Sequence, residues 1–133
     1  MKTIDKVAWL HLHEGRLLST RSRGKDRYYI PGGKREAGET DAETLVREIK
    51  EELTVDLEVA SLQHVGTFKA QAHGHPTGVN VVMICYSGHY TGTLQPAAEI
   101  EEVVWLRYQD RSLVSPVDQK IFDWLREQQL FAE

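Results

Sequence analysis

The chain has 133 residues, a formal net charge of -4 at pH 7 and a hydrophobic content of 41%. This length suits a single domain, residues 1–133, and the apolar fraction is sufficient for a buried core. The acidic balance argues against a protein that binds nucleic-acid polymers through a broad basic surface. A chain of this kind that handled phosphates would have to place its positive charge locally or take it from metal ions.

No stretch has the length and apolarity of a membrane span, and the charged N-terminus lacks the apolar segment of a signal peptide. The single cysteine, Cys85, cannot form an internal disulfide. It lies in an apolar run, which favours a buried, unreactive thiol over a nucleophile. We therefore expect a cytoplasmic protein that does not contact a membrane.

The first third of the chain alternates in polarity, as strands do. Residues 7–12 predict a strand with Ala8 on one face and Val7 on the other, and residues 16–20 return as a hairpin partner. Residues 28–30 form a short strand-like piece, which ends at a proline and two glycines.

The clearest helix is predicted for residues 41–53. Thr40 is a good N-cap, and Glu43 three residues later completes a capping box. Helical spacing defines a buried stripe made of Ala42, Leu45, Val46, Ile49 and Leu53.

The rest of the chain predicts strands at residues 55–68, 79–86 and 103–106, followed by an amphipathic helix at residues 117–130. Strands outnumber helices, and the helices are isolated between them. This order indicates an α+β fold, an α/β/α sandwich in which helices flank a mixed central β-sheet.

Three glutamates of the first helix, Glu48, Glu51 and Glu52, are spaced at i, i+3 and i+4 and are predicted to share a face beside the buried stripe. Like charges at this spacing oppose the helix by roughly 0.2–0.5 kcal/mol per pair. A hard cation would compensate them, although an acidic helix face is more often simply solvated. The preceding Gly32 and Gly33 favour a site, because they let the backbone turn tightly and approach a ligand.

The segment from Gly33 to Val55 resembles the Nudix box, the signature of the Nudix (MutT-type) hydrolase family. The matching run is Gly33, five residues, Glu39, seven residues, and then Arg-Glu-Ile-Lys-Glu-Glu at residues 47–52, so that eight of nine defined positions agree. The exception is Thr54, where the family has a glycine that ends the helix in the left-handed conformation. A threonine with those angles would cost roughly 1–2 kcal/mol, which favours a differently built helix end.

This resemblance implies the Nudix fold and a site for a divalent ion, Mg²⁺ or Mn²⁺. In the family, the glutamates that correspond to Glu51 and Glu52 hold the ion, and the one that corresponds to Glu48 often joins them. The carbonyl before the box glycine, here that of Gly32, commonly completes the site.

The resemblance also implies an orienting pair, Glu39 with Arg47, which ties the loop to the helix. A further acidic residue comes from a later loop in the family. Glu99 has the expected spacing before a tryptophan and is the first candidate, Glu102 is the second, and a charged strand edge is the alternative for both. Glu48 or Glu99 is the expected general base.

The sequence also suggests residues that could bind the substrate. A basic segment that contains Arg21 and Arg23 suits the outer phosphates of a polyphosphate, with ordinary surface charge as an equal alternative. Alternation places Tyr28 and Tyr29 on opposite faces, so one of them can stack on a base. Asp118 corresponds to residues that read a base edge in nucleoside triphosphate members, and capping the last helix is its alternative role.

The implied function is metal-dependent hydrolysis of a diphosphate linkage in a nucleoside triphosphate or nucleoside diphosphate derivative, by attack of water on phosphorus. One alternative is an ADP-sugar or ADP-ribose pyrophosphatase, but such members often carry a proline where this chain has Ala70 and Gln71. An alternative of another class is a nucleotide-binding sensor that does not hydrolyse, but such domains typically lose box carboxylates. Family members are often dimers, so a homodimer is a further expectation. His73 and His75 lack further ligands at metal spacing and are interpreted as part of a loop.

Overall fold

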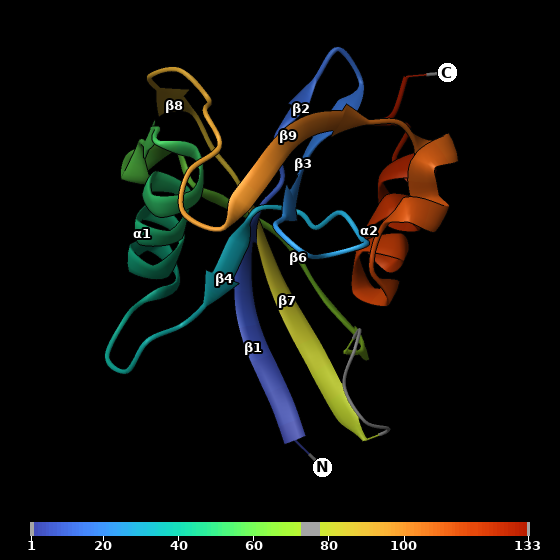
Figure 1. Cartoon of the computed structure of the whole chain (residues 1–133), viewed down its shortest axis with the longest axis horizontal. Coiled ribbons are helices and arrows are strands. Elements are labelled where there is room, and N and C mark those ends of the chain that lie inside the picture. The colour runs from blue at the N-terminus through green and yellow to red at the C-terminus, as the bar shows by residue number, and fades with distance from the viewer. Residues whose placement is uncertain (1, 73–77, 133) are drawn as a thin grey trace.

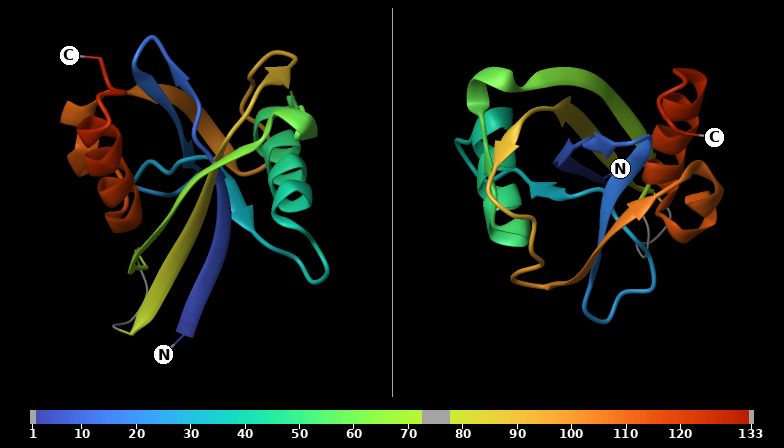
Figure 2. Two further views of the ribbon diagram at one scale, coloured as in Figure 1. Left: turned by 180° about the vertical axis from the view of Figure 1, so that it is seen from behind. Right: turned by 90° about the horizontal axis from the view of Figure 1, so that it is seen from above.

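The computed structural model describes residues 2–72 and 78–132, and in it the strands lie between two helices (Figure 1). Seen from above, the same three layers appear, with α1 and α2 on opposite sides of the strands (Figure 2). The helices are α1 (Asp41–Leu53) and α2 (Pro116–Glu127), with the 3-10 turns η1 (Val59–Ser61) and η2 (Tyr108–Leu113). The strands are β1 (Lys2–Trp9), β2 (Leu12–His13), β3 (Arg16–Ser22), β4 (Gly32–Lys34), β5 (Asp56–Leu57), β6 (Gln63–Gln71), β7 (Val79–Ser87), β8 (Tyr90–Thr91) and β9 (Ile100–Leu106). The predicted α+β sandwich is confirmed.

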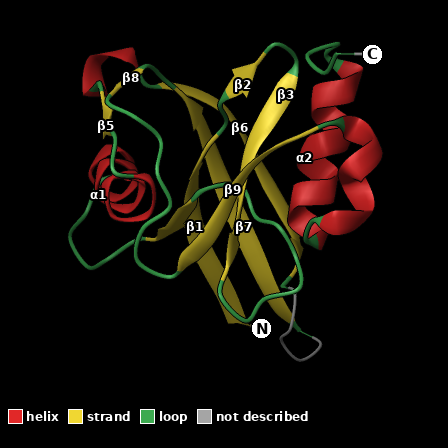
Figure 3. Ribbon diagram, turned by 45° about the horizontal axis from the view of Figure 1, so that its top comes forward, coloured by secondary structure: helices red, strands yellow, loops and turns green. Residues whose placement is uncertain are grey.

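The largest sheet has the strand order β4-β1-β7-β6, and smaller sheets are formed by β2-β3-β9 and by β5-β8. Within the large sheet β1 runs parallel to β7, whereas the β4–β1 and β7–β6 pairs are antiparallel, so the sheet is mixed as predicted. Figure 3 shows the helices in red on either side of the yellow strands. No helix within residues 2–72 and 78–132 combines the length and apolarity that a membrane crossing requires.

The C-terminal part of strand β1, from Val7 to Trp9, is buried on both faces because a helix covers each of them. Val7 and Trp9 belong to the cluster that includes Leu45 of α1, whereas Ala8 and Leu10 belong to the cluster that packs on α2. The alternation predicted from the sequence is therefore correct, and it sorts side chains between two cores rather than between core and solvent.

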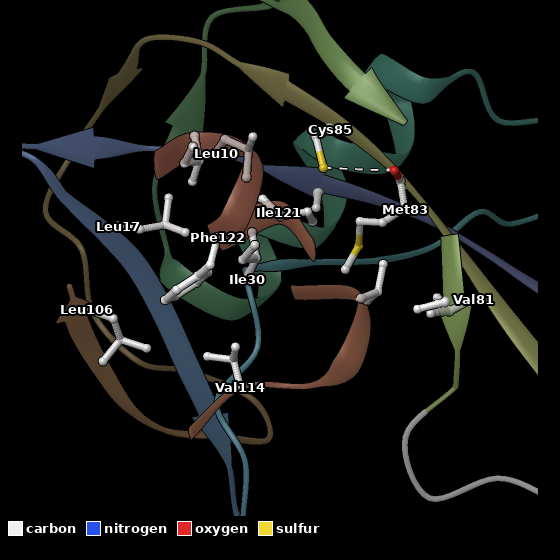
Figure 4. Close-up of a cluster of buried hydrophobic side chains, with 14 of the residues drawn as sticks. Leu10, Leu17, Ile30, Val81, Met83, Cys85, Leu106, Val114, Ile121 and Phe122 are labelled. Atoms are coloured by element: carbon white, nitrogen blue, oxygen red, sulfur yellow. Dashed lines mark hydrogen bonds between the residues drawn. The ribbon is translucent and has the colours of Figure 1, made fainter. Parts of the chain in front are cut away.

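The core beneath α2 contains the single cysteine (Figure 4). Cys85 is fully buried, and its Sγ lies 3.9 Å from the carbonyl oxygen of Met83. Burial raises the pKa of the thiol well above its ordinary value. Cys85 is therefore a core residue, as the sequence indicated.

Several predicted boundaries are corrected by the structure. Strand β1 starts at Lys2 instead of residue 7, because polar residues alternate with buried ones before Val7 and conceal the strand. The single strand predicted over residues 55–68 is divided into β5, η1 and β6, since β5 pairs with β8 and not with the large sheet. Gly32 and Gly33, predicted as a loop, belong to the short strand β4.

Helix α1 has the predicted ends and core face. The Glu43 backbone N–H donates to Thr40 Oγ1 at 3.1 Å, and the Thr40 N–H donates to the Glu43 carboxylate at 3.0 Å, which confirms the capping box. Leu45 and Ile49 are fully buried. Helix α2 ends at Glu127, earlier than predicted, and Ile121 and Leu125 are buried as expected while Trp124 is partly buried.

The end of α1 explains how threonine replaces the box glycine. Thr54 adopts the left-handed conformation, with φ of 65°, so the helix ends with the same backbone angles that glycine would provide. Its hydroxyl donates to the Thr93 carbonyl at 3.2 Å. The Gln95 N–H donates to the Leu53 carbonyl at 3.0 Å, which satisfies an acceptor that the helix end leaves open. The expectation of a differently built helix end is therefore wrong for the backbone, and the contact of the Thr54 hydroxyl was not predicted.

The conformation of Thr54 predicts that Thr54→Gly stabilises the fold. Glycine removes the left-handed strain, but it loses the hydroxyl contact and has more freedom in the unfolded chain, so the expected net gain is about 0.5–1 kcal/mol. Urea unfolding measures it, with Thr54→Val as the control that keeps the strain and loses the hydroxyl. A Thr54→Gly protein that unfolds at lower urea than the wild type would contradict the strain argument.

Candidate active site

A cavity of about 370 Å³ lies where the glycine strand β4 meets α1, the two sheets and the start of α2. Its walls come from segments far apart in the sequence. They include Ile4, Lys6, Thr20, Ser22, Lys25, Tyr29, Ile30, Gly32, Gly33, Lys34, Glu48, Glu52, Gln71, Ala72, Val81, Met83, Glu99, Ile100, Ser115 and Val117. Gly32, Gly33 and two of the three glutamates of the α1 cluster, Glu48 and Glu52, thus share one cavity.

Glu48 and Glu52 are one helical turn apart and face the cavity beside β4. Glu52 is only 7% exposed, and its Oε1 accepts a hydrogen bond from the Gly32 N–H at 3.2 Å. The carboxylate of Glu48 lies against Gly33, where a Cβ would stand 2.3 Å from the Glu48 Cδ. The absence of side chains at both glycines therefore allows the helix and the strand to approach this closely.

The environment of these carboxyl groups disfavours their ionised forms. Burial raises the pKa of Glu52 to about 8, and the nearby charges of Glu48 and Glu99 act in the same direction. Burial also raises the pKa of Glu48, although Arg47 opposes this effect. Carboxylate oxygens that face one cavity from neighbouring turns of a helix fit a hard divalent cation.

Glu51, the third glutamate expected in the metal site, does not lie where the sequence predicted. Glu51 does not line the cavity; its side chain is 54% exposed and lies 3.6 Å from the Arg47 guanidinium. Among the residues that the structure describes, no three His, Cys, Asp or Glu side chains are already arranged to hold a metal ion. Three glutamates on one shared face were predicted, but Glu52 points inward because the Gly32 N–H lies there.

Arg47 ties the box loop to the helix, as the sequence suggested. Its Nε donates to Glu39 Oε2 at 2.8 Å and its Nη2 to Glu39 Oε1 at 2.9 Å, which makes a two-pronged pair. Its Nη1 donates to Glu48 Oε1 at 2.9 Å, and its Nη2 also reaches the Lys34 carbonyl at 3.2 Å. One guanidinium therefore fixes the loop and orients a cavity carboxylate.

The two acidic candidates from the later segment, Glu99 and Glu102, lie in different surroundings. Glu99 lines the cavity, and its backbone carbonyl accepts from the Arg23 N–H at 2.9 Å. Glu102 accepts from Arg21 Nε at 2.8 Å and from the Tyr28 hydroxyl at 2.6 Å and does not line the cavity. The geometry thus favours Glu99.

Of the residues expected to bind the substrate, some line the cavity and others do not. Tyr29 lines the cavity. Arg21 and Arg23 do not, because Arg21 is engaged with Glu101 and Glu102, and Arg23 Nη2 donates to the Ala98 carbonyl.

Asp118 is fully buried behind the cavity wall. It lies inside α2, whose N-cap residue is Ser115, so it does not take the N-cap position that the sequence favoured for it. Its Oδ2 accepts from the Ile30 N–H at 2.9 Å, and burial raises its pKa to about 7. Within the described residues, its Oδ1 has no hydrogen-bond partner. The predicted loop with His73 and His75 lies outside the described residues.

Lysines of the cavity wall were missed by the sequence analysis. Lys6 and Lys34 face each other across the β1–β4 pair, and Lys25 comes from the basic segment. Lys6 was overlooked because β1 was predicted to start too late; extending the alternation back through Ile4 would have placed it on the face of Ala8. The positive charge of the cavity is therefore carried by lysines.

Comparison with known protein families identifies the class to which this site belongs. The model of the NUDIX domain matches residues 4–126, which is most of the chain. The chain therefore belongs to the NUDIX family. Among curated proteins no sequence matches significantly.

Solved structures of the family have the same fold. The chain resembles the Escherichia coli ORF135 protein, with a TM-score of 0.74, 25% identity and coverage of 97% of this chain and 94% of that one. It also resembles a MutT NUDIX hydrolase from Burkholderia pseudomallei (TM-score 0.72, 21% identity, 92% and 96% coverage). A MutT protein from Methanosarcina mazei Go1 is similar to the same degree (TM-score 0.72, 18% identity, 96% coverage of both chains).

The pairing of Glu39 with Arg47 predicts a defined response to acid. Hydrogen bonds from Arg47 lower the pKa of Glu39 from 4.5 to about 2, and such a carboxylate stabilises the fold at pH values above its unfolded pKa. This stabilisation is lost as the pH falls from about 4.5 to about 2. The urea midpoint of the wild type should therefore approach that of Glu39→Gln as the pH falls through this window.

Arg47→Lys is the matched variant, because it keeps the charge and loses the two parallel hydrogen bonds. Near neutral pH, Glu39→Gln should lower the urea midpoint of the wild type. The same substitution introduced into Arg47→Lys should lower the midpoint less, because the two hydrogen bonds are already lost. A wild-type advantage over Glu39→Gln that stayed constant throughout the acid window would refute the pairing as the cause.

Proposed function

We propose that the protein hydrolyses the diphosphate linkage of a nucleoside triphosphate or nucleoside diphosphate derivative with Mg²⁺ or Mn²⁺ as cofactor. The observation that carries this proposal is that carboxylates, among them the buried Glu52, line the same cavity as several lysines. A diphosphate needs cations around its oxygens, and a divalent ion needs the carboxylates. The cavity of a NUDIX chain offers both within one site.

We assign the metal to the carboxylate side of the cavity. Glu52 and Glu48 face it, and the Gly32 backbone adjoins Glu52. Glu51 is exposed beside Arg47 and would have to turn towards the cavity to act as a further ligand. When bound, the ion neutralises charge on the phosphate oxygens and stabilises the charge that develops on the leaving phosphate.

Glu48 is our candidate for the general base. Its carboxylate is held by Arg47 and by contact with Gly33, so it can accept a proton from a water molecule from a fixed position. Burial raises its pKa towards the range in which a carboxylate is a better base. Glu99, which lines the same cavity, is the second candidate for this role.

The substrate side is assigned to the groups that line the cavity. Lys25 and Lys34 are positioned to bind phosphates there, whereas Arg21 and Arg23 would first have to leave their present partners. Tyr29 offers a ring on which a base can stack. Asp118 would reach a base edge only after the cavity wall had moved, since it is fully buried.

The metal assignment predicts that Glu52→Gln binds Mn²⁺ or Mg²⁺ more weakly than the wild type. Loss of one buried anionic ligand should lower the affinity by about tenfold or more, because the site keeps its shape but loses a charge. Calorimetric titration measures this without any substrate. Glu127→Gln, an exposed change in α2, is the control and should match the wild type. Equal affinities for Glu52→Gln and the wild type would count against Glu52 as a ligand.

The catalytic assignment predicts that Glu48→Gln lowers turnover by about 10²–10⁴-fold and leaves substrate affinity nearly unchanged. The substrate is first found by screening nucleoside triphosphates and diphosphate derivatives, ADP-ribose and ADP-sugars included, with either metal. Hydrolysis in ¹⁸O-water should place the label in a phosphate product, as attack on phosphorus requires.

Full activity of Glu48→Gln would remove Glu48 as the base and leave Glu99 as the residue to test. Cleavage of ADP-ribose or ADP-sugars in preference to triphosphates would favour the first alternative substrate class. Absence of cleavage of any compound with either metal, combined with tight binding, would favour a nucleotide sensor instead.

A further inference from the structure

Arg21 lies near the end of β3 and is held between two consecutive glutamates of β9. It pairs with Glu102 in the β3–β9 ladder. The following pair is Ser22 with Ile100, which leaves Glu101 as the extra residue of a β-bulge. The bulge lets both glutamates reach one guanidinium, although side chains of a regular strand alternate between faces. Arg21 Nε donates to Glu102 Oε1 at 2.8 Å, and Arg21 Nη1 lies 3.3 Å from Glu101 Oε2.

The same guanidinium also holds the turn that follows β3. Arg21 Nη1 donates to the Lys25 carbonyl at 3.2 Å, and this nitrogen carries two hydrogens, so it can serve Glu101 as well. The Lys25 N–H closes the turn by donating to the Ser22 carbonyl at 3.1 Å, and Gly24 supplies a φ of 79° within it. The backbone of Lys25 is therefore fixed on both sides, at its N–H by the turn and at its carbonyl by Arg21.

This turn forms part of the cavity wall, and Arg21 lies just outside it. Ser22 and Lys25, the two ends of the turn, line the cavity, as do Glu99 and Ile100 on the facing segment of β9. Arg21 does not line it. The bulge is thus the point beyond which both strands enter the wall, and Arg21 fastens the turn at that point.

The charges separate the roles of Arg21 and Lys25. Arg21 faces two carboxylates, so the group as a whole is negative and does not attract a phosphate. Glu102 is itself held by the Tyr28 hydroxyl at 2.6 Å, which keeps its carboxylate in place against Arg21. Lys25 is exposed and, within the part of the chain that the structure describes, makes no ion pair, so its charge is left for a ligand.

We propose that Arg21 is a positioning residue, which holds the turn that presents Lys25 to the phosphates of the substrate and does not bind them itself. The proposal rests on the proposed function, in which Lys25 binds phosphates. Loss of Arg21 frees the Lys25 backbone, so that the ammonium group is no longer kept at the cavity. Arg21 should therefore matter for phosphate binding only while Lys25 is present.

The test is a double-mutant cycle on binding of methylenediphosphonate, an analogue of pyrophosphate that carries no base and has no cleavable P–O–P linkage. Calorimetry with Mg²⁺ present compares the wild type, Arg21→Met, Lys25→Met and the double variant. Each single change should weaken binding by about threefold or more, and the double variant should bind no more weakly than Lys25→Met alone. Losses that multiply in the double variant would show that Arg21 binds phosphate directly and would overturn the proposal.

Arg111→Met is the matched control for the lost charge. Arg111 also makes two hydrogen bonds to one carboxylate, that of Asp123, at 2.8 and 3.0 Å, and it does not line the cavity. This variant should bind methylenediphosphonate like the wild type. Urea unfolding separates positioning from stability, because Arg21→Met should lower the urea midpoint equally with and without Lys25, whereas its effect on binding should vanish without Lys25. If Arg21→Met fails to fold, Arg21→Lys takes its place in the cycle, since it keeps the charge and loses the fork.

Two further results would overturn the proposal. Unchanged binding by Arg21→Met would show that the turn needs no support from Arg21. Absence of binding by the wild type would remove Lys25 as a phosphate ligand and the role of Arg21 with it. Because binding is measured without turnover, a wild type that binds the analogue as described but hydrolyses no nucleotide would refute the proposed hydrolysis and leave the role of Arg21 intact.

Discussion

The close passage of β4 between β1 and α1 is the constraint on which the site depends. Gly32 pairs with Ala8 at a φ of 146°, and a Cβ there would stand 2.1 Å from the Val7 carbonyl oxygen. At Gly33 the same atom would collide with the Glu48 carboxylate. Only glycine lets the strand lie against both neighbours, and this places the helix carboxylates at the edge of the large sheet.

A second consequence is that opposite charges face one cavity without being paired to one another. The cavity is lined by three glutamates and by lysines, namely Glu48, Glu52, Glu99, Lys6 and Lys34. The side chains of Glu48 and Glu52 are largely buried, and burying them in ionised form is costly unless cations compensate them. A bound metal ion would supply that charge, so its binding is expected to relieve a cost that folding alone leaves in place.

The segment after β8 links the end of the helix to this site. The Gln95 and Ala97 N–H groups donate to the carbonyls of Leu53 and Glu52, and the chain then delivers Glu99 to the cavity. Arg23 holds the other side of this segment through its contacts with Ala98 and Glu99. Its role in the structure is therefore to support the loop that carries a cavity carboxylate.

The sequence predicted the features that depend on local spacing. The capping box at Thr40 and the buried face of α1 both depend on spacing within one helix, whereas the Glu39–Arg47 pair was implied by the resemblance to the Nudix box. The mixed sandwich followed from the order of elements. Boundaries were less accurate where polar residues interrupt a pattern, as at the start of β1, because alternation alone does not show that both faces of a strand are covered.

What only the tertiary structure decided is which of the charged residues reach the cavity. Helical spacing placed Glu51 with Glu48 and Glu52, but the Gly32 N–H draws Glu52 inward and leaves Glu51 exposed. The basic segment suggested Arg21, yet Glu102 engages it from β9, and Lys6 takes a place in the wall from a strand that pairs with β4 and β7. Partners of this kind are brought together by sheet pairing across long sequence separations. Local sequence patterns therefore determined the helix and its carboxylates, and the packing of distant strands determined how those carboxylates are used.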